Sequence, residues 1–378
     1  MAKRKKNKVR TEFRKRYGIR NRQSDVTRQF KAVGEDELQT SQERLTGRGE
    51  LAKKRVIRGE ETNNADDTGQ SFVLEVNHAE CEFGQVLRVH GLNSIVLLKD
   101  GRTVQCAVRG LLKTIGTDLR HVVVAGDFVA VKMQDRNEGV IQRVEPRRGC
   151  ISRTSRGRQH LIAANIQQLM IVTSCAEPQM KPNLIDRFLL TAEKSSVQPI
   201  IVINKVDLVD AADVQAIAGS FGQLGYPVIF IAATQNWGVS LLRKWVVGRR
   251  TVIAGQSGVG KSSILNAIQP GLSLKVNAVS EENQKGKHTT TTAQLIPLDA
   301  GGFMLDTPGI RQFQLWDLAP AEVDGWFRDL RPWVDQCHFP NCTHTHEVDC
   351  AVKSAVADGR IDLRRYDSYC QMHAGDMI

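Results

Sequence analysis

The stretch Thr251 to Ser263, TVIAGQSGVGKSS, decides the fold of this chain. A short apolar run leads into the pattern Gly-x-x-x-x-Gly-Lys-Ser of residues 255–262, and the following residues 263–268 have the apolar spacing of a helix. The order is therefore strand, glycine-rich turn, helix. Glycines let backbone N–H groups turn inward around phosphate oxygens at the positive end of a helix dipole. A chance surface turn is the alternative, but this placement between a strand and a helix favours a phosphate-binding loop.

Each residue of the loop has an expected task. Lys261 reaches the β- and γ-phosphates and thereby takes part in catalysis, and the Ser262 hydroxyl ligates Mg²⁺. The nucleotide-binding residues predicted here are Gly255, Gln256, Ser257, Gly258, Val259, Gly260, Lys261, Ser262 and Ser263.

Length, charge and cysteine content limit what the chain can be. Its 378 residues suffice for two or three domains, and a formal net charge of +11 favours a polyanionic partner. No apolar run approaches the roughly 20 residues of a membrane span, and the charged N-terminus lacks the apolar core of a signal peptide. We therefore expect a cytoplasmic protein without a membrane partner. Its 8 cysteines then indicate thiols or a metal site rather than disulfides.

Residues 1–70 have the composition of a disordered tail, first basic and then polar and acidic, with too few large apolar residues for a core. Residues 1–22 carry 11 lysines and arginines against the single acidic residue Glu12. The tail is expected to be an arm that binds RNA or phosphate, because so dense a charge releases counterions from a nucleic acid. The alternative is a solvated, solubilising tail.

Residues 80–148 form short alternating runs broken by turns and show no helical period, which predicts a small β-barrel of the five-stranded OB-fold type. The expected strands lie within residues 84–91, 94–101, 103–110, 121–133 and 139–147. Aromatics for base stacking are scarce, since only Phe83 and Phe128 occur. Contact with RNA is therefore expected through Arg88, Lys99, Arg102, Arg109, Lys113, Arg147 and Arg148. A purely structural barrel remains the alternative.

Residues 150–315 alternate strands and helices, which is typical of a parallel α/β sheet. Strands are expected within 167–175, 199–209 and 226–234, and helices within 184–196, 213–225 and 239–247, all before the phosphate loop. Two further strands are expected after it, joined at residues 300–302 and ending on Asp306-Thr307-Pro308-Gly309. The loops should meet at the carboxyl ends of the strands.

Asn204, Lys205, Val206 and Asp207 directly follow an apolar strand, where a base-binding loop belongs. The Asp207 carboxylate can accept two hydrogen bonds, from guanine N1–H and the 2-amino group, which adenine cannot supply. A mismatched base would leave that carboxylate unpaired, so the site is expected to bind GTP over ATP. Asp306 is expected to hold the Mg²⁺ shell, and the Gly309 N–H to face the γ-phosphate.

The order of these motifs is unusual. The base-binding loop precedes the phosphate loop, which precedes Asp306 to Gly309, whereas most GTPases begin with the phosphate loop. The chain is therefore a circular permutation, which is tolerated because the same strands can be assembled from a chain cut elsewhere on the surface. The segment that senses the γ-phosphate then runs into the C-terminal domain, and we expect this domain to be the lever.

Residues 283–292, NQKGKHTTTT, are too polar and hydroxyl-rich for a packed core. Thr290, or else Thr289 or Thr291, is expected to close on Mg²⁺ and the γ-phosphate. His288 is either the residue that orients the attacking water or an exposed loop histidine. Ras-like GTPases carry a glutamine after the Asp-x-x-Gly motif, but Ile310 stands here, so intrinsic hydrolysis is expected to be slow and to need a partner.

Residues 316–378 contain Cys337, Cys342, His344 and Cys350. Three thiolates and one imidazole fill the four positions of tetrahedral Zn²⁺ and leave none open, so we predict one structural zinc site. Free thiols, or His346 in place of His344, are the alternatives. The scattered Cys81, Cys106, Cys150, Cys175 and Cys370 are expected to be packing residues, as are the aromatic residues Trp316, Trp326, Phe327 and Trp333.

Taken together, these motifs resemble the circularly permuted GTPases of the ribosome small subunit-dependent GTPase A type, over about residues 80–370. The resemblance implies an OB-fold, a permuted GTPase domain and a mainly helical zinc-binding domain. It also implies late maturation of the small ribosomal subunit, rRNA binding, and GTP hydrolysis stimulated by that subunit. Functional residues carry over to Asn204, Lys205, Asp207, the loop 255–263 and the four zinc ligands.

One position departs from the family pattern. The loop that usually reads Ser-Ala is here Ala232-Ala233, and little loss is expected if the loop acts through a backbone N–H to guanine O6. The chain is expected to be a monomer. Two competing functions remain: an RNA-binding protein that uses the nucleotide site only as a GTP/GDP sensor, and a P-loop kinase or ATPase, which Asp207 disfavours.

Overall fold

The structure is a computed structural model that describes residues 8–10, 56–61, 72–74, 76–110, 112, 122–155, 158–271, 293–306 and 320–375. The chain divides into two units, residues 1–61 and 62–378. In the first, β1 (Lys8–Arg10) pairs antiparallel with β2 (Val56–Glu61). These two short strands lie within the stretch expected to have no stable fold, and the β-branched Val56 and Ile57 favour an extended backbone. The rest of residues 1–61 lies outside the described residues.

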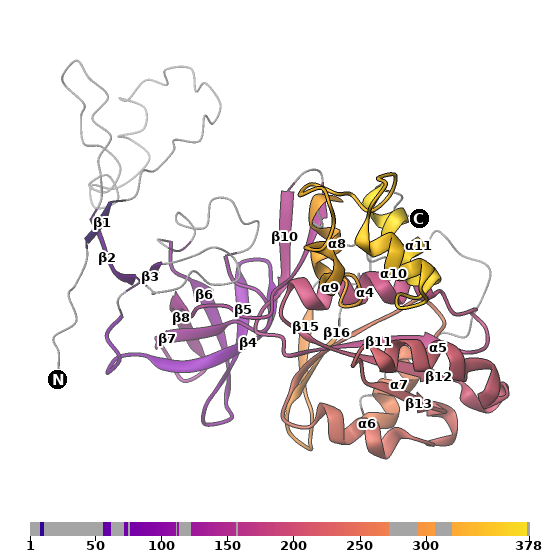
Figure 1. Ribbon diagram of the computed structural model, residues 1–378. Coiled ribbons are helices and arrows are strands. Elements are labelled where there is room, and N and C mark those ends of the chain that lie inside the picture. The colour runs from indigo at the N-terminus through magenta and orange to yellow at the C-terminus, as the bar shows by residue number, and fades with distance from the viewer. Residues whose placement is uncertain are drawn as a thin grey trace, which may run out of the picture. The chain divides into compact units, whose positions relative to one another are not determined.

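The second unit contains the predicted five-stranded barrel (Figure 1). Its strands are β4 (Glu82–His90), β5 (Asn93–Leu98), β6 (Thr103–Val108), β7 (Phe128–Met133) and β8 (Glu138–Val144). They follow the order β4-β5-β6-β8-β7, and β4 also pairs with β7, which closes the barrel. Apolar residues alternate along the strands, so that Val86, Val96 and Val129, each fully buried, fill the interior. The short β3 (Phe72–Leu74) precedes this barrel in the chain.

The expected strand over residues 121–133 begins only at Phe128. The preceding residues turn at Gly126, whose φ is +91° and whose added Cβ would meet the Ala164 carbonyl oxygen at 2.1 Å. The next residue, Asp127, is fully buried and accepts two hydrogen bonds from Arg147. The apolar sequence before Phe128 therefore packs as a turn held by a buried ion pair rather than as a strand.

The α/β sheet follows the predicted alternation. Its strands are β11 (Gln168–Ser174), β12 (Gln198–Asn204), β13 (Val228–Ile231), β14 (Arg250–Ala254), β15 (Gln294–Pro297) and β16 (Phe303–Asp306). Their order is β13-β12-β11-β14-β16-β15, and all neighbours are parallel except β15 and β16. Because neighbouring parallel strands end on the same edge, the loops after β11, β12, β13 and β14 lie together there.

Helices cover both faces of this sheet (Figure 1). They are α4 (Pro182–Lys194), α5 (Ala211–Gln223), α6 (Val239–Val246) and α7 (Lys261–Ile268), with single turns η1 (Val206–Leu208) and η2 (Ala233–Gln235). Phe188 of α4 and Phe221 of α5 belong to one apolar core, whereas Leu242 of α6 and Leu265 of α7 belong to another. The sheet is thus packed between two helical layers.

Two features of this unit were not predicted. A hairpin of β9 (Ile151–Ser155) and β10 (Arg158–Ala163) lies between the barrel and the sheet in the chain. Strand β15 also pairs with β4 of the barrel, with Gln294 opposite Arg88. The strands of the barrel and of the α/β sheet are therefore joined by hydrogen bonds into one continuous sheet.

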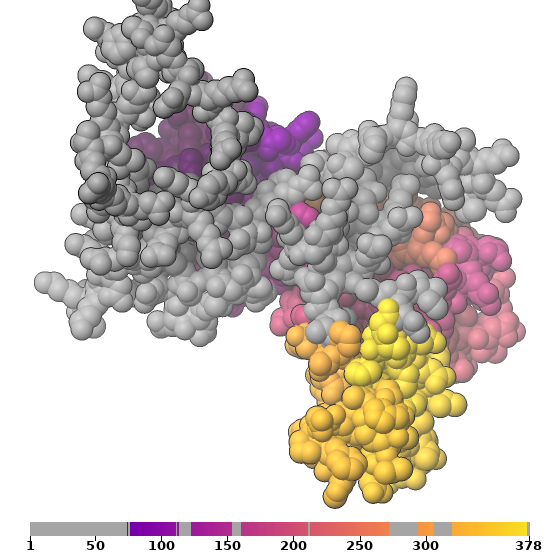
Figure 2. Space-filling view, turned by 90° about the horizontal axis from the view of Figure 1, so that it is seen from above, coloured from indigo at the N-terminus to yellow at the C-terminus, as the bar shows by residue number. Residues whose placement is uncertain are grey.

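The C-terminal region consists of η3 (Pro320–Glu322), α8 (Val323–Trp326), α9 (Arg331–Val334), α10 (Ala351–Ala357) and α11 (Leu363–His373). These residues form one continuous mass, orange to yellow in Figure 2. Phe327 and Tyr369 are buried in its core, and Trp326 and Trp333 pack against it, as expected of packing aromatics. Trp316 lies outside the described residues. Leu190 of α4 belongs to the same core, so the C-terminal helices pack directly on a helix of the α/β sheet.

Buried charges strengthen this attachment. Asp186 of α4 is fully buried and accepts hydrogen bonds from Arg365 (2.6 Å) and Arg364 (2.7 Å) of α11. Arg365 also donates twice to Asp329, at 3.0 and 2.7 Å. Since both acidic partners and Arg365 are almost completely buried, each charge depends on the others for its compensation. Among the described residues, none of the helices is long and apolar enough to cross a membrane.

Candidate nucleotide site and metal centre

The phosphate loop connects β14 to α7, as the sequence predicts. Two of its glycines are required by close packing rather than by flexibility alone. Gly255 has a φ of +142°, and an added Cβ would lie 2.1 Å from the Val172 carbonyl oxygen. Gly260 has a φ of +95°, and its Cβ would lie 2.3 Å from Nδ2 of Asn204. The loop is thus pressed against β11 on one side and against the base-binding loop on the other.

Lys261 is the first residue of α7 and is half-buried. Its Nζ donates to the carbonyl oxygens of Gly255 (2.7 Å) and Gln256 (2.5 Å). The ammonium group is therefore held against the curve of the loop. It lies beside the helix N-terminus, where such loops bind phosphate oxygens.

Asn204 joins the loops that follow three strands. Its Nδ2 donates to the Val259 carbonyl oxygen (2.9 Å), and its Oδ1 accepts from the Ala233 N–H (3.1 Å). The side chain is buried, so both hydrogen bonds are shielded from water. The sequence predicted these three segments as parts of one nucleotide site, and Asn204 brings them into direct contact.

The neighbouring residues of the base-binding loop occupy the edge of this site. Lys205 adopts a left-handed conformation with φ of +67°, and its ammonium group donates to the Glu177 carbonyl oxygen after β11. Asp207 follows in η1 and is exposed. Its carboxylate accepts a hydrogen bond from Gln235 Nε2 at 3.1 Å. The sequence did not single out Gln235.

Other predicted site residues lie outside the described part of the chain. These are His288, Thr290, Gly309 and the side chain of Asp306. The backbone of Asp306 ends β16, whose residue Leu305 pairs with Val252 of β14, so that strand runs beside the one that feeds the phosphate loop. The catalytic and magnesium-binding roles expected of these residues remain predictions.

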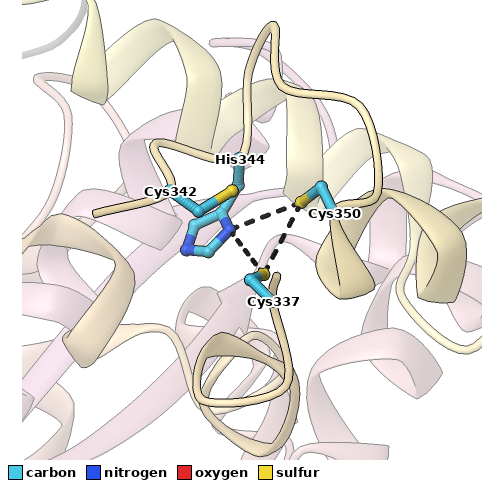
Figure 3. Close-up of side chains that lie close together, drawn as sticks. All are labelled: Cys337, Cys342, His344 and Cys350. Atoms are coloured by element: carbon cyan, nitrogen blue, oxygen red, sulfur yellow. Dashed lines mark hydrogen bonds between the residues drawn. The ribbon is translucent and has the colours of Figure 1, made fainter. Parts of the chain in front are cut away.

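The four predicted metal ligands converge at one point (Figure 3). Their ligand atoms all lie within 4.8 Å of one another. His344 Nδ1 is 3.4 Å from Cys337 Sγ and 3.5 Å from Cys350 Sγ, and these sulfurs are 3.9 Å apart. A tetrahedron with zinc–sulfur bonds of about 2.3 Å has sulfur–sulfur edges of about 3.8 Å. The donor set and its spacing therefore fit Zn²⁺.

His344, not His346, is the histidine of this cluster. His346 is 81% exposed, and its Nδ1 lies 3.1 Å from Thr345 Oγ1. His344 is buried, which lowers its pKa against the opposing effect of Asp324, whose Oδ2 lies 3.6 Å from Nε2. A neutral imidazole suits a metal ligand, and the Asp324 carboxylate lies on the side of the far nitrogen at a distance longer than a hydrogen bond. Asp324 was not predicted, because it lies on α8 and comes close only in the folded chain.

The loop that carries these ligands is fixed from two sides. Tyr366 and Tyr369 of α11 donate to the carbonyl oxygens of His344 and Thr343, both at 2.7 Å. Glu347 accepts from the N–H groups of Thr343 (2.8 Å) and Thr345 (3.1 Å). Burial by itself would raise the pKa of Glu347, but the hydrogen bond from the Thr343 hydroxyl (2.6 Å) and those from the two N–H groups hold that pKa well below its ordinary value. The loop is thus preformed around its ligands.

On the barrel, the structure revises the set of residues expected to contact RNA. Arg147 is buried and paired with Asp127, so it is not available to a phosphate backbone. Lys113 lies outside the described residues. Phe83 and Phe128, judged too few for stacking, line one surface hollow together with Lys99. The Lys99 ammonium lies 5.5 Å from the centre of the Phe83 ring.

Comparison with known proteins agrees with this arrangement. A model of the RsgA GTPase family matches residues 144–316. The small ribosomal subunit biogenesis GTPase RsgA of Phocaeicola vulgatus is 34% identical over 295 residues, which cover 76% of this chain and 95% of that protein. The protein of the same name from Thermotoga petrophila is 36% identical over 296 residues, with coverages of 76% and 95%.

Two solved structures are similar along almost their whole length. The crystal structure of YjeQ from Thermotoga maritima superposes with a TM-score of 0.66 at 32% identity, covering 78% of this chain and 98% of that one. The structure of YloQ, a circularly permuted GTPase, gives a TM-score of 0.62 at 29% identity, with coverages of 80% and 97%. The chain has a barrel, a permuted P-loop domain and a cysteine–histidine cluster, in the order expected. With this degree of similarity to its relatives, it belongs to the RsgA family of GTPases.

Proposed function

We propose that this protein hydrolyses GTP to GDP and phosphate and uses that reaction as a maturation factor of the small ribosomal subunit. The observation that carries the proposal is the bridge made by Asn204. It ties the phosphate loop at Val259 to the loop at Ala233, and it stands directly before the guanine-reading Lys205-Val206-Asp207. The relatives named small ribosomal subunit biogenesis GTPases supply the biological setting.

In this proposal each loop reads one part of GTP. Asp207 accepts hydrogen bonds from guanine N1–H and the 2-amino group. The N–H groups of Ala232 and Ala233 already donate to Trp237 and Asn204, so the Thr234 N–H is the candidate donor to guanine O6. Lys261 binds the β- and γ-phosphates. A magnesium ion, when bound, neutralises charge on these oxygens, and Ser262, Thr290 and Asp306 are the residues that would hold it.

Hydrolysis is expected to be slow without a partner. Ile310 has no polar group to orient a water molecule, and His288 is the residue proposed for that task. The zinc-type cluster offers four protein ligands and leaves no open position, so the proposed Zn²⁺ stabilises the C-terminal domain and takes no part in the reaction.

Contact with rRNA is proposed for the barrel. Its hollow is lined by Phe83, Phe128 and Lys99, residue types that contact the bases and phosphates of RNA. The 11 basic residues among the first 22 would add sequence-independent attraction. We place this activity in the cytoplasm and expect the protein to act as a monomer.

The test is single-turnover GTP hydrolysis by the full chain with and without purified small ribosomal subunits. Stimulation by orders of magnitude is expected. A rate that subunits leave unchanged, together with subunit binding that depends on GTP or GDP, would instead favour a nucleotide sensor without catalytic turnover. Co-sedimentation with GDP, GTP and a non-hydrolysable analogue supplies that second measurement.

A further inference from the structure

The carboxylate of Asp207 has a protein partner on another loop. Gln235 Nε2 donates to Asp207 Oδ2 at 3.1 Å, although the two residues are 28 positions apart. Asp207 lies in the turn after β12, whereas Gln235 ends the turn after β13. The hydrogen bond therefore joins the two loops that meet at the proposed guanine site.

The backbone of Gln235 is fixed on its own side of this contact. Its N–H donates to the Ala232 carbonyl oxygen (3.1 Å), and Ala232 and Trp237 exchange two hydrogen bonds of 3.1 Å each. Asn236 closes the turn with a φ of +57°. The Ala233 N–H donates a hydrogen bond to Asn204 Oδ1, which belongs to a different loop. The glutamine side chain consequently leaves a closed, anchored turn rather than a free loop.

The chemistry of the contact suits base recognition. A carboxylate has two oxygens and about four acceptor positions, so one neutral N–H donor leaves capacity for the two donors of guanine. An amide does not neutralise the carboxylate, as a lysine or arginine would. Ala232 and Ala233, in place of the family's usual Ser-Ala, contribute no side-chain donor to this loop. In the turn Ala232–Trp237, the Gln235 amide is the donor that the structure brings to Asp207.

We propose that Gln235 is a positioning residue for guanine specificity: it fixes the Asp207 carboxylate in the orientation that accepts guanine N1–H and the 2-amino group. This inference rests on the proposed role of Asp207 in reading the base. Without the amide, the exposed carboxylate samples other rotamers, and part of the binding free energy is spent on ordering it when guanine arrives.

Calorimetric titration of the full chain with GTP, GDP, inosine triphosphate and ATP tests the proposal. Gln235→Met keeps the length of the side chain and removes its donor. Its affinity for GTP and GDP is expected to fall about fivefold to tenfold, as for the loss of one ordinary protein hydrogen bond at an exposed position. Inosine lacks the 2-amino group, so its triphosphate should lose less, whereas ATP binding should not change.

A double-mutant cycle with Asp207→Ala separates positioning from other roles. In the Asp207→Ala background, Gln235→Met is expected to have no further effect on GTP affinity. A loss that persists there means that Gln235 contacts the nucleotide itself and overturns the positioning role. Thermal unfolding without nucleotide should be unchanged by Gln235→Met, and a lowered midpoint would assign the glutamine to loop stability instead.

The cycle also separates this inference from the proposed function. If Asp207→Ala weakens GTP binding but Gln235→Met does not, the positioning role is wrong and the guanine assignment stands. If Asp207→Ala leaves GTP affinity unchanged, Asp207 does not read the base, and both fail.

Discussion

At Gly260, one missing methyl group allows two loops to meet. The phosphate loop approaches Asn204 so closely that any side chain at this position would collide with the amide that organises the site. The amide nitrogen and the amide oxygen of Asn204 each form a hydrogen bond to a neighbouring loop. The phosphate and base sites are therefore coupled through a single buried residue, and a change at either loop is expected to affect both.

Gly260→Ala is predicted to weaken GTP binding at least tenfold. Its Cβ would lie 2.3 Å from Asn204 Nδ2, and the shift needed to relieve that contact breaks the hydrogen bond to Val259. Gly271→Ala is the matched control, since Gly271 also has a positive φ, of +116°, but its added Cβ meets no atom of the described residues within 4 Å. Equal GTP affinities of the two variants in a nucleotide titration would show that the positive φ, rather than the contact with Asn204, accounts for any loss of binding.

Lys261→Ala is predicted to abolish measurable GTP binding while the fold persists. The ammonium group donates to the carbonyl oxygens of Gly255 and Gln256, and these oxygens can accept from water instead when the side chain is removed. Calorimetry measures the affinity, and circular dichroism with thermal unfolding checks the fold. Retained affinity would contradict the assignment of this lysine to the phosphates.

Single residues differ in how far the sequence reveals them. The phosphate loop, Asn204 and the four metal ligands were predicted because their chemistry depends on local spacing, such as Cys337-x4-Cys342. Gln235 and Asp324 were not, since their partners lie on separate elements and no pattern in the chain links them. Arg147 was misjudged because surface and buried arginines look alike until Asp127 is brought beside them.

At the scale of elements, α4 has two tasks. Its apolar side packs on the sheet, through residues such as Ile185 and Leu189, and its Leu190 and Asp186 belong to the interface with the C-terminal helices. The expected lever is therefore attached to the GTPase layer through α4, as well as through the covalent connection after β16. Motion of the C-terminal region relative to α4 would have to break buried ion pairs.

Asp186→Ala is predicted to destabilise the folded chain by about 3 kcal/mol, because the buried Arg365 then keeps only one of its two buried acidic partners. Glu322→Ala is the control, since its ion pair with Lys194 is half exposed and is worth less than about 1 kcal/mol. Chemical denaturation of both variants measures the difference. Similar losses in the two variants would mean that the buried pair is no stronger than the exposed one.

Cys342→Ser is predicted to lose the metal ion and to unfold the C-terminal region. In the absence of a metal ion, burial raises the pKa of Cys342 to about 12, so the folded loop has little thiolate to offer unless a metal displaces the proton. Metal analysis and circular dichroism check this outcome. Cys370→Ser, on the same domain but outside the cluster, should keep its metal; loss there would point to a general destabilisation.

At the scale of the whole molecule, charge is distributed unevenly along the chain. Residues 1–22 hold 11 of the 52 basic residues, although they form a small part of the sequence. Sequence-independent attraction to RNA depends on the number of phosphates neutralised and weakens steeply as salt rises. The basic tail is therefore expected to act mainly on the strength and salt dependence of binding.

Deletion of residues 1–22 is predicted to lower affinity for the small subunit at low salt and to make its salt dependence shallower. The GTPase rate of the free protein should not change. Co-sedimentation at two ionic strengths measures the first effect, and phosphate release measures the second. Parallel salt dependences for the full and shortened chains would assign the tail to solubility.

The sequence predicted the barrel, the parallel sheet and the helical C-terminal region because each has its own hydrophobic period. It could not predict how they join. The single pairing of Gln294 with Arg88, which links barrel and sheet, lies at strand edges where no pattern records a partner. The β9–β10 hairpin was missed for a related reason, since its residues lie between two regions of clear rhythm.

The attachment of α4 to α11 also has a consequence for the order in which the chain folds. Asp186 and Arg365 are 179 positions apart, whereas Asn204 and Val259 are 55 apart. A chain growing from its N-terminus completes the nucleotide loops well before the arginines that neutralise Asp186 are synthesised. Contacts of long sequence separation close late because their loop entropy is largest. The nascent protein is therefore able to assemble the nucleotide-binding loops before Asp186 is paired with the arginines of α11.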